Sequence, residues 1–173
     1  IGIICVVLVV PGITTADLTL YEATELLATD GFDEDEFGYS VCVSGDVAVV
    51  GSRYDDDYGD ESGSAYIYRL VDGTWVEEDK LNPNDAAGGV LFGWSVSISG
   101  DLALVGSRYD NEAGEKSGSA YIFRFNGETW DEEAKLLATD GLPNDRFGWS
   151  VAIEGDTAIV GAENSDESGA VYV

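Results

Sequence analysis

The sequence predicts an all-β fold built from repeated four-stranded units, and three observations carry this prediction. The tetrapeptide that begins at Phe37 returns in similar form at Phe92 and Phe147, at a regular spacing of about 55 residues. Gly-Asp, Asp-Gly and Asn-Gly pairs, which favour tight hairpin turns because they tolerate positive φ, recur between the candidate strands. No stretch shows the 3.6-residue periodicity of an amphipathic helix.

Each unit divides into four short strands. In the first unit we expect these at 39–43, 47–50, 65–69 and 75–81. Gly45-Asp46 separates the first two strands and Asp72-Gly73 the last two, while Asn126-Gly127 is the corresponding pair in the second unit. The third strand alternates and is rich in aromatic and β-branched residues. Four-stranded antiparallel units at a fixed period of about 40 to 55 residues are typical of the blades of a β-propeller.

The strand count predicts about three blades. Residues 20–26 align one period before 75–81, so we expect an outer strand there without the other three strands of its blade. At the other end, residues 170–173 correspond to the third strand of a unit, and the sequence ends there. Three twisted sheets are too few to close a ring. The sequence therefore predicts either a piece of a larger propeller or self-association of several chains to complete one ring.

The N-terminus predicts a truncated signal peptide at 1–16. Its ten apolar residues are too few to span a bilayer but fit the apolar core of a leader, and small residues precede Asp17. A buried strand is the alternative. We therefore expect the blades to occupy 17–173, with repeats starting near 37, 92 and 147, in a secreted or cell-surface protein without a transmembrane segment in the mature chain.

The composition restricts partners and chemistry. The 34 acidic residues outnumber the 8 basic ones, for a net charge of -26. Nucleic acid and anionic membranes would be repelled, which leaves cations, basic proteins and neutral glycans. The chain has no histidine, so Ser-His-Asp or Cys-His catalysis and histidine-ligated metal sites are excluded. We expect a protein that is not an enzyme.

Three motifs resemble the FG-GAP repeat, which forms the propeller of integrin α subunits and of many secreted microbial proteins. Phe-Gly opens the first strand of each unit, Val-Gly closes the second, and Ser-Gly precedes the third. The resemblance covers about 20–173 and implies a β-propeller. Integrin-type repeats often hold calcium in an Asp-x-Asp-x-Asp-Gly loop between the first two strands. Here that loop is a Gly-Asp turn, so that calcium site is not expected, and the proline of "GAP" is replaced by Arg53, Arg108 and Glu163.

Acidic loops mark one face of the predicted propeller. The connections between second and third strands and between successive units are long, and antiparallel topology places them on the same face. The first inter-unit loop adds four acidic residues at 33–36. Candidate ligand-binding residues on this face are Asp55, Asp56, Asp57, Asp60, Glu61, Asp110, Asn111, Glu112, Glu115, Glu163 and Asp166.

Three interpretations of this acidic face stay open. The first is a solvated surface that serves solubility. The second is a face that binds a ligand or a protein. The third is a Ca²⁺ site made by Asp55, Asp57 and Asp60. Carboxylates at alternate positions next to a glycine suit Ca²⁺, so Ca²⁺ is a candidate cofactor. The pattern does not match an EF-hand loop.

The predicted function is an extracellular binding or adhesion scaffold that recognises a protein or glycan ligand through its acidic loops. The alternatives are the propeller portion of a carbohydrate-active enzyme and a structural envelope or matrix protein. Against the enzyme, the Asp-box of propeller glycosidases is not matched, because Phe123 and Phe125 stand where it needs Ser and Asp. We expect Tyr39, Trp94 and Trp149 to pack between sheets rather than to stack on sugars.

Overall fold

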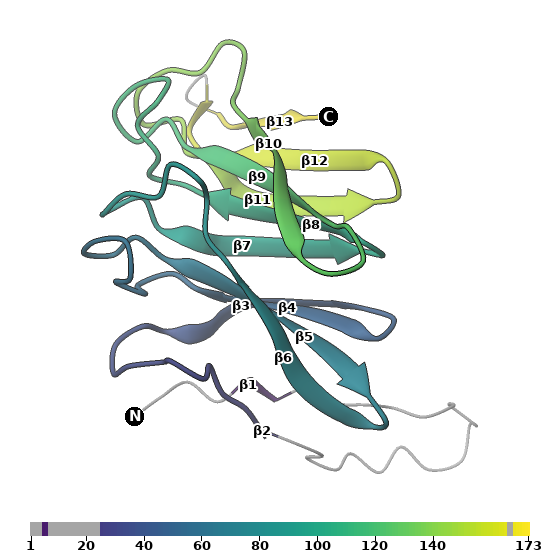
Figure 1. Cartoon of the computed structure of the whole chain (residues 1–173). Helices are drawn as coiled ribbons and strands as arrows, with labels where there is room; N and C mark the ends of the chain where they lie inside the picture. The colour runs from purple at the N-terminus through teal and green to yellow at the C-terminus, as the bar shows by residue number, and fades with distance from the viewer. Residues whose placement is uncertain (1–4, 7–24, 166–167) are drawn as a thin grey trace, which may run out of the picture.

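The computed structural model describes residues 5–6, 25–165 and 168–173, and it has no α-helix within them. Three antiparallel sheets lie face to face in chain order, and each is one blade (Figure 1). The first blade contains β3 (Phe37–Ser44), β4 (Val47–Ser52), β5 (Ser64–Val71) and β6 (Thr74–Leu81). The second contains β7 (Phe92–Ser99), β8 (Leu102–Ser107), β9 (Ser119–Phe125) and β10 (Trp130–Leu136). The third contains β11 (Phe147–Glu154), β12 (Thr157–Ala162) and β13 (Ala170–Tyr172).

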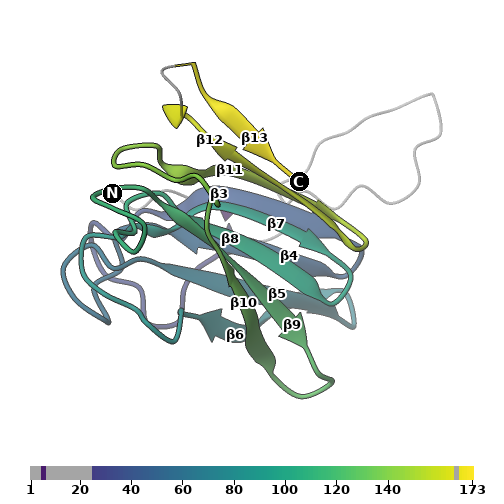
Figure 2. The same cartoon turned by 90° about the horizontal axis from the view of Figure 1, so that it is seen from above.

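This arrangement confirms the all-β fold and the blade architecture. Within each blade the strands follow chain order from the inner to the outer edge. The inner strands β3, β7 and β11 lie beside one another, whereas β6 and β10 lie at the far edge of their sheets (Figure 2). The third blade has three strands among the described residues, so it ends on the unpaired edge of β13.

The hairpin turns form where the sequence predicts them, and one of them differs in length. Asp72 and Gly73 join β5 to β6 with φ of 50° and 80°, the conformation that a two-residue turn with two positive φ angles requires. The equivalent turn of the second blade instead takes four residues, Asn126–Thr129. There the Asn126 side chain accepts hydrogen bonds from the backbone N–H groups of Glu128 and Thr129. This side-chain turn stabilises a longer loop than the dipeptide predicts.

The backbone geometry at the start of each inner strand explains why a Phe-Gly pair is found there. The pairing of β3, β7 and β11 with their neighbours shifts register directly after the phenylalanine. The glycines there, Gly38, Gly93 and Gly148, have φ of 87°, 80° and 86°. A Cβ on Gly93 would collide with the backbone oxygen of Ser64 in the preceding blade. The glycine therefore allows two blades to approach backbone to backbone.

The apolar core consists of layers between successive blades. Alternate residues of a strand face opposite layers, so Val49 and Ile67 pack toward the second blade while Val50 and Tyr66 pack on the other side. A third layer lies between the second and third blades.

The N-terminal segment contributes one described core residue. β2 (Glu25–Leu26) pairs with β1 (Cys5–Val6), and Leu26 is buried against the outer half of the first blade. Leu81 has the same place on the second blade, one repeat later. The rest of the predicted outer strand 20–26, and the rest of the predicted leader, lie outside the described residues. No helix in the part of the chain that the structure describes is long and apolar enough to cross a membrane.

Candidate functional site

The two ends of the strands carry different connections. Long loops lead from the second to the third strand of each blade and from each blade to the next, and they gather on one side of the molecule, at the left in Figure 1. We call this side the loop face. Short hairpin turns occupy the opposite side. The acidic candidates from the sequence lie on the loop face, so that face is the place to look for a site.

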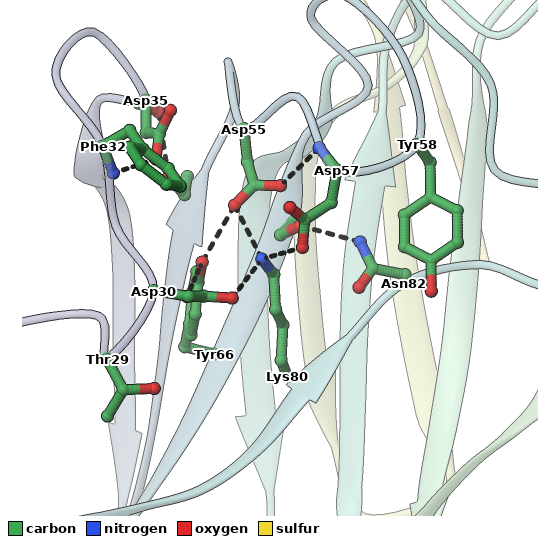
Figure 3. Close-up of polar contacts among 12 residues, drawn as sticks. Thr29, Asp30, Phe32, Asp35, Asp55, Asp57, Tyr58, Tyr66, Lys80 and Asn82 are labelled. Atoms are coloured by element: carbon green, nitrogen blue, oxygen red, sulfur yellow. Dashed lines mark hydrogen bonds and ion pairs between the residues drawn. The ribbon is translucent and has the colours of Figure 1, made fainter.

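A lysine surrounded by carboxylates organises the loop face of the first blade (Figure 3). Lys80 Nζ lies 2.8 Å from Asp30, 2.9 Å from Asp55 and 2.6 Å from Asp57. The Tyr66 hydroxyl donates to Asp30 and Asp55, each at 2.9 Å. We call these five residues the lysine cluster. It ties two loops to β5 and β6.

The lysine cluster is a closed charge network. Asp55 is buried, with 2% of its surface exposed. Burial opposes the charge on Lys80, but the hydrogen bonds that its ammonium group donates to Asp30, Asp57 and Asp55 outweigh this effect and raise the pKa of Lys80 above its usual range. Burial and the neighbouring Asp55 likewise raise the pKa of Tyr66. The lysine therefore stays charged and the tyrosine neutral at neutral pH, which suits a structural role.

The second blade repeats this network, and the third changes it. Lys135 Nζ lies 2.6 Å from Asp85, 2.9 Å from Asp110 and 2.6 Å from Glu112. In the third blade Tyr172 donates to Asp140 at 2.8 Å, and Ser165 stands where the other blades have a buried aspartate. The described part of that blade has no fourth strand to supply a lysine, so a buried aspartate there would have no cation.

Other carboxylates of the first blade surround an open pocket instead. The pocket lies between the loop before β3 and the loop after β4, and its volume is about 630 Å³. We call it the acidic pocket, and it is lined by Asp33, Glu34, Asp35, Glu36, Tyr54, Asp56, Asp60 and Glu61. Burial raises the pKa of Asp35, although its carboxylate accepts a hydrogen bond from the Phe32 N–H. The other acidic side chains of the lining, apart from Glu36, are exposed.

The structure thus separates the candidate residues into groups. Asp55, Asp57, Asp110 and Glu112 belong to the two lysine networks, while Asp56, Asp60 and Glu61 line the acidic pocket. Elsewhere, Asn111 accepts a hydrogen bond from the Lys116 N–H, Glu115 is exposed, and Glu163 pairs with Arg146 at 2.7 Å. Asp166 lies outside the described residues.

The candidate calcium ligands do not converge on one point. Asp55 and Asp57 share the Lys80 ammonium group, whereas Asp60 lines the acidic pocket. Among residues 5–6, 25–165 and 168–173 there is no group of three or more His, Cys, Asp or Glu side chains placed to hold a metal ion. A calcium site stays a prediction, and Lys80 already supplies the positive charge between two of its three proposed ligands.

An aromatic row lies where the inner strands begin. The ring of Trp94 lies 4.7 Å from that of Tyr39 and 5.2 Å from that of Trp149, as expected for packing between blades. The guanidinium carbon of Arg53 lies 3.8 Å from the centre of the Tyr39 ring, and that of Arg108 lies 3.3 Å from the centre of the Trp94 ring. The arginines that replace the proline of the repeat motif therefore cap this row through cation–π contacts.

Comparison with known families explains the repeated geometry. The FG-GAP repeat family matches residues 21–68, 75–123 and 130–173. The chain belongs to the FG-GAP repeat family. FG-GAP repeats are propeller blades, typically non-catalytic and commonly found in extracellular binding domains. A search of curated proteins finds no match. The second and third FG-GAP matches begin on the outer strands β6 and β10 and end on the third strands β9 and β13, so each of these two repeats spans two neighbouring blades.

Proposed function

We propose that this FG-GAP chain is an extracellular binding or adhesion module whose acidic pocket takes a positively charged segment of a partner protein. The observation that carries the proposal is the pocket itself. Seven of its eight lining residues are Asp or Glu. Two cations of the same blade are already engaged, because Arg53 pairs with Glu36 at 2.6 Å and Lys80 belongs to the lysine cluster.

The geometry favours extended basic side chains as the ligand. Lysine and arginine carry their charge on long stems that reach into an open pocket, and guanidinium groups bind carboxylates in a fork. A net charge of -26 adds long-range attraction that speeds encounter with a basic partner and weakens as salt rises. A neutral glycan would gain nothing from this field.

The family and the N-terminus support the extracellular setting. FG-GAP repeats are commonly extracellular, and the apolar run at 1–10 has the length of a leader core. A rigid stack of blades that presents loops on one face suits adhesion, because the loops can vary without disturbing the sheets.

The test is the affinity of an arginine-glycine peptide, measured by calorimetry at two salt concentrations. In the pocket variant Glu34→Gln/Asp60→Asn/Glu61→Gln we expect at least about tenfold weaker binding and a weaker salt dependence. The matched control is Asp72→Asn/Glu154→Gln/Asp156→Asn, which removes the same charge from exposed residues on the side of the hairpin turns. It should lose about threefold or less.

Two outcomes would overturn the proposal. Equal losses in both variants would mean that the peptide responds to net charge and not to the pocket. Binding of a neutral oligosaccharide on a glycan array, unchanged by salt and by the pocket substitutions, would place recognition on a different surface and favour a lectin.

A further inference from the structure

The eight basic residues of this acidic chain all lie in the part that the structure describes. Six of them form ion pairs with carboxylates, namely Arg53, Arg69, Lys80, Arg124, Lys135 and Arg146. The other two are Arg108 and Lys116, and neither forms an ion pair among the described residues. Both lie beside the ring of Tyr109. The two cations without a carboxylate are therefore neighbours.

Three cations surround Tyr109 on the loop face. The centre of its ring lies 4.2 Å from the guanidinium carbon of Arg108, 5.0 Å from Nζ of Lys116 and 5.8 Å from the guanidinium carbon of Arg146. The Nη2 group of Arg108 also donates a hydrogen bond to the Tyr109 hydroxyl at 2.9 Å. All four residues are partly exposed, so a ligand can reach them. We call these four residues the Tyr109 site.

The Tyr109 site lies one repeat after the acidic pocket, at the corresponding place on the second blade. A backbone hydrogen bond of 3.2 Å joins the loop before the inner strand to the loop after the second strand in both blades. The side chains differ. Among the seven acidic residues that line the pocket, only Asp60 has an acidic counterpart, Glu115, and Lys116 replaces Glu61. The same backbone therefore presents carboxylates in the first blade and mainly cations in the second.

The first and third blades each place a glutamate on an arginine where these two loops meet. Arg53 pairs with Glu36 at 2.6 Å in the first blade. In the third blade the two charges have exchanged positions, and Arg146 pairs with Glu163 at 2.7 Å. Each pair joins the residue directly before the inner strand to the residue directly after the second strand. A glutamate carboxylate therefore fits this place on the backbone.

The second blade has the arginine without the glutamate, because Leu91 stands where the first blade has its carboxylate. The guanidinium group of Arg108 stacks on the Trp94 ring, and its Nε is buried with no hydrogen-bond partner among the described residues. Burial lowers the pKa of Arg108, and the neighbouring Arg146 and Arg53 act in the same direction. A carboxylate beside Arg108 would offset both effects.

We propose that the Tyr109 site binds a carboxylate side chain from an acidic segment of a partner protein. The carboxylate contacts Arg108 as Glu36 contacts Arg53, and Lys116 adds a second positive charge. A guanidinium group that stacks on a ring through its face keeps its N–H edge for a carboxylate. The site shares no residue with the lining of the acidic pocket, so it does not depend on the proposed recognition of a basic segment.

The charge of the whole chain favours a single protein carboxylate over a polyanion. A net charge of -26 repels dense negative charge at long range, so a nucleic acid or a sulfated polymer would meet a large barrier. One glutamate or aspartate on an otherwise uncharged segment meets far less repulsion. The two groups that fill this place elsewhere in the chain are also glutamate side chains.

The experiment is a titration of the chain with a capped glycine-glutamate-glycine peptide in about 0.1 M NaCl. NMR of the arginine side chains and of the Tyr109 backbone amide follows the binding. We expect saturable shifts at Arg108 and Tyr109 and none at Arg124, which pairs with Glu133 near the hairpin turns. The matched glycine-glutamine-glycine peptide should cause no saturable shift.

Single substitutions locate the carboxylate. Arg108→Gln and Lys116→Gln should each weaken peptide binding by about fivefold or more, whereas the control Arg124→Gln, with the same change in net charge, should weaken it by less than about twofold. Leu91→Glu supplies the carboxylate of the first blade from within the chain and should abolish peptide binding with every cation in place. Circular dichroism checks the fold of each variant. If Leu91→Glu does not fold, the two cation variants still decide the question.

Three results would overturn the proposal. The first is the absence of a saturable shift at Arg108 and Tyr109. The second is an equal loss of affinity in Arg108→Gln and Arg124→Gln, which would mean that the peptide responds to net charge and not to the site. The third is inorganic sulfate that shifts the same resonances with equal or higher affinity, which would make this a site for a small inorganic anion.

Discussion

The lysine cluster and the acidic pocket lie side by side on the loop face of one blade and are built from the same residue types. In the cluster, three carboxylates converge on Lys80, two of them also accept hydrogen bonds from the Tyr66 hydroxyl, and Asp55 is almost fully buried. In the pocket, seven acidic residues surround an open cavity, and Arg53 pairs with Glu36 at its edge. The first arrangement ties the loops to the strands, whereas in the second most of the carboxylates are exposed.

The difference shows that a run of acidic residues does not define a site by itself. Asp55, Asp56 and Asp57 are consecutive, yet the first and third contact Lys80 while the second lines the pocket. The position of one lysine on a neighbouring strand decides which carboxylates are structural. Substitutions can therefore change the two regions separately.

Removal of the lysine should have the largest effect. Lys80→Met leaves a buried Asp55 and two neighbouring carboxylates without their cation, so we expect the free energy of unfolding to fall by about 3–5 kcal/mol. Urea denaturation measures this. The control is Arg124→Met, which breaks the exposed pair with Glu133 and should lower the free energy of unfolding far less than Lys80→Met does. Equal losses in the two variants would contradict the structural role of the cluster.

Acid should weaken the lysine networks. Burial opposes ionisation of Asp30 and Asp85, but hydrogen bonds from Lys80 and Lys135 lower the pKa of each carboxylate below its usual value. Their stabilisation is therefore fully present above about pH 4 and is lost as the pH falls through the lowered values. Thermal melts from pH 6 to pH 2 should show a smaller acid-induced loss in Asp30→Asn than in wild type. Identical pH profiles would refute this.

Acid should have the opposite effect on the stability contribution of Asp35 in the acidic pocket. Burial raises the pKa of Asp35, so its ionised form destabilises the fold above that pKa, and the penalty disappears as the pH falls through it. Asp35→Asn keeps an acceptor for the Phe32 N–H and removes the charge. At pH 7 we expect its Tm to rise by about 1–3 °C, with little gain at pH 3. A lower Tm at pH 7 would show that Asp35 supports the loop as an anion.

Calcium should have the smallest effect on wild type. Since Lys80 already lies between Asp55 and Asp57, we expect millimolar Ca²⁺ to change Tm by less than about 2 °C. Folded Lys80→Met frees these carboxylates and should be stabilised more by Ca²⁺ than wild type. A large calcium-dependent shift in wild type that Asp60→Asn abolishes would instead support the calcium site expected from Asp55, Asp57 and Asp60.

The sequence was sufficient to predict the blades and the two sides of the molecule, because alignment of the repeats shows both the strands and the loops that join them. The regular spacing of the Phe-Gly pairs aligned the four strands of each unit, and loop length distinguished the acidic side from the side of the hairpin turns. The four-residue turn at Asn126 was not predictable from its dipeptide, because the side-chain hydrogen bonds that lengthen it compete with a two-residue turn of similar composition.

The division of the acidic residues could not be predicted from one loop. Lys80 and Lys135 lie on outer strands, separated in sequence by a whole strand from the aspartates that they contact, and only the fold brings them together. One signal was present in the sequence. The Lys80 and Tyr66 positions recur one repeat later together with the buried aspartate, whereas the third unit has Ser165 in place of that aspartate.

The most direct test of this division is the thermal shift caused by an arginine-glycine peptide in two variants of equal charge. Asp60→Asn/Glu61→Gln changes the pocket, and Asp55→Asn/Asp57→Asn changes the lysine cluster. We predict that the pocket variant keeps the Tm of the free protein and loses the peptide-induced shift, while the cluster variant has a lower Tm and keeps the shift. A pocket variant that retains the full shift, or a cluster variant that loses only the shift, would contradict the account.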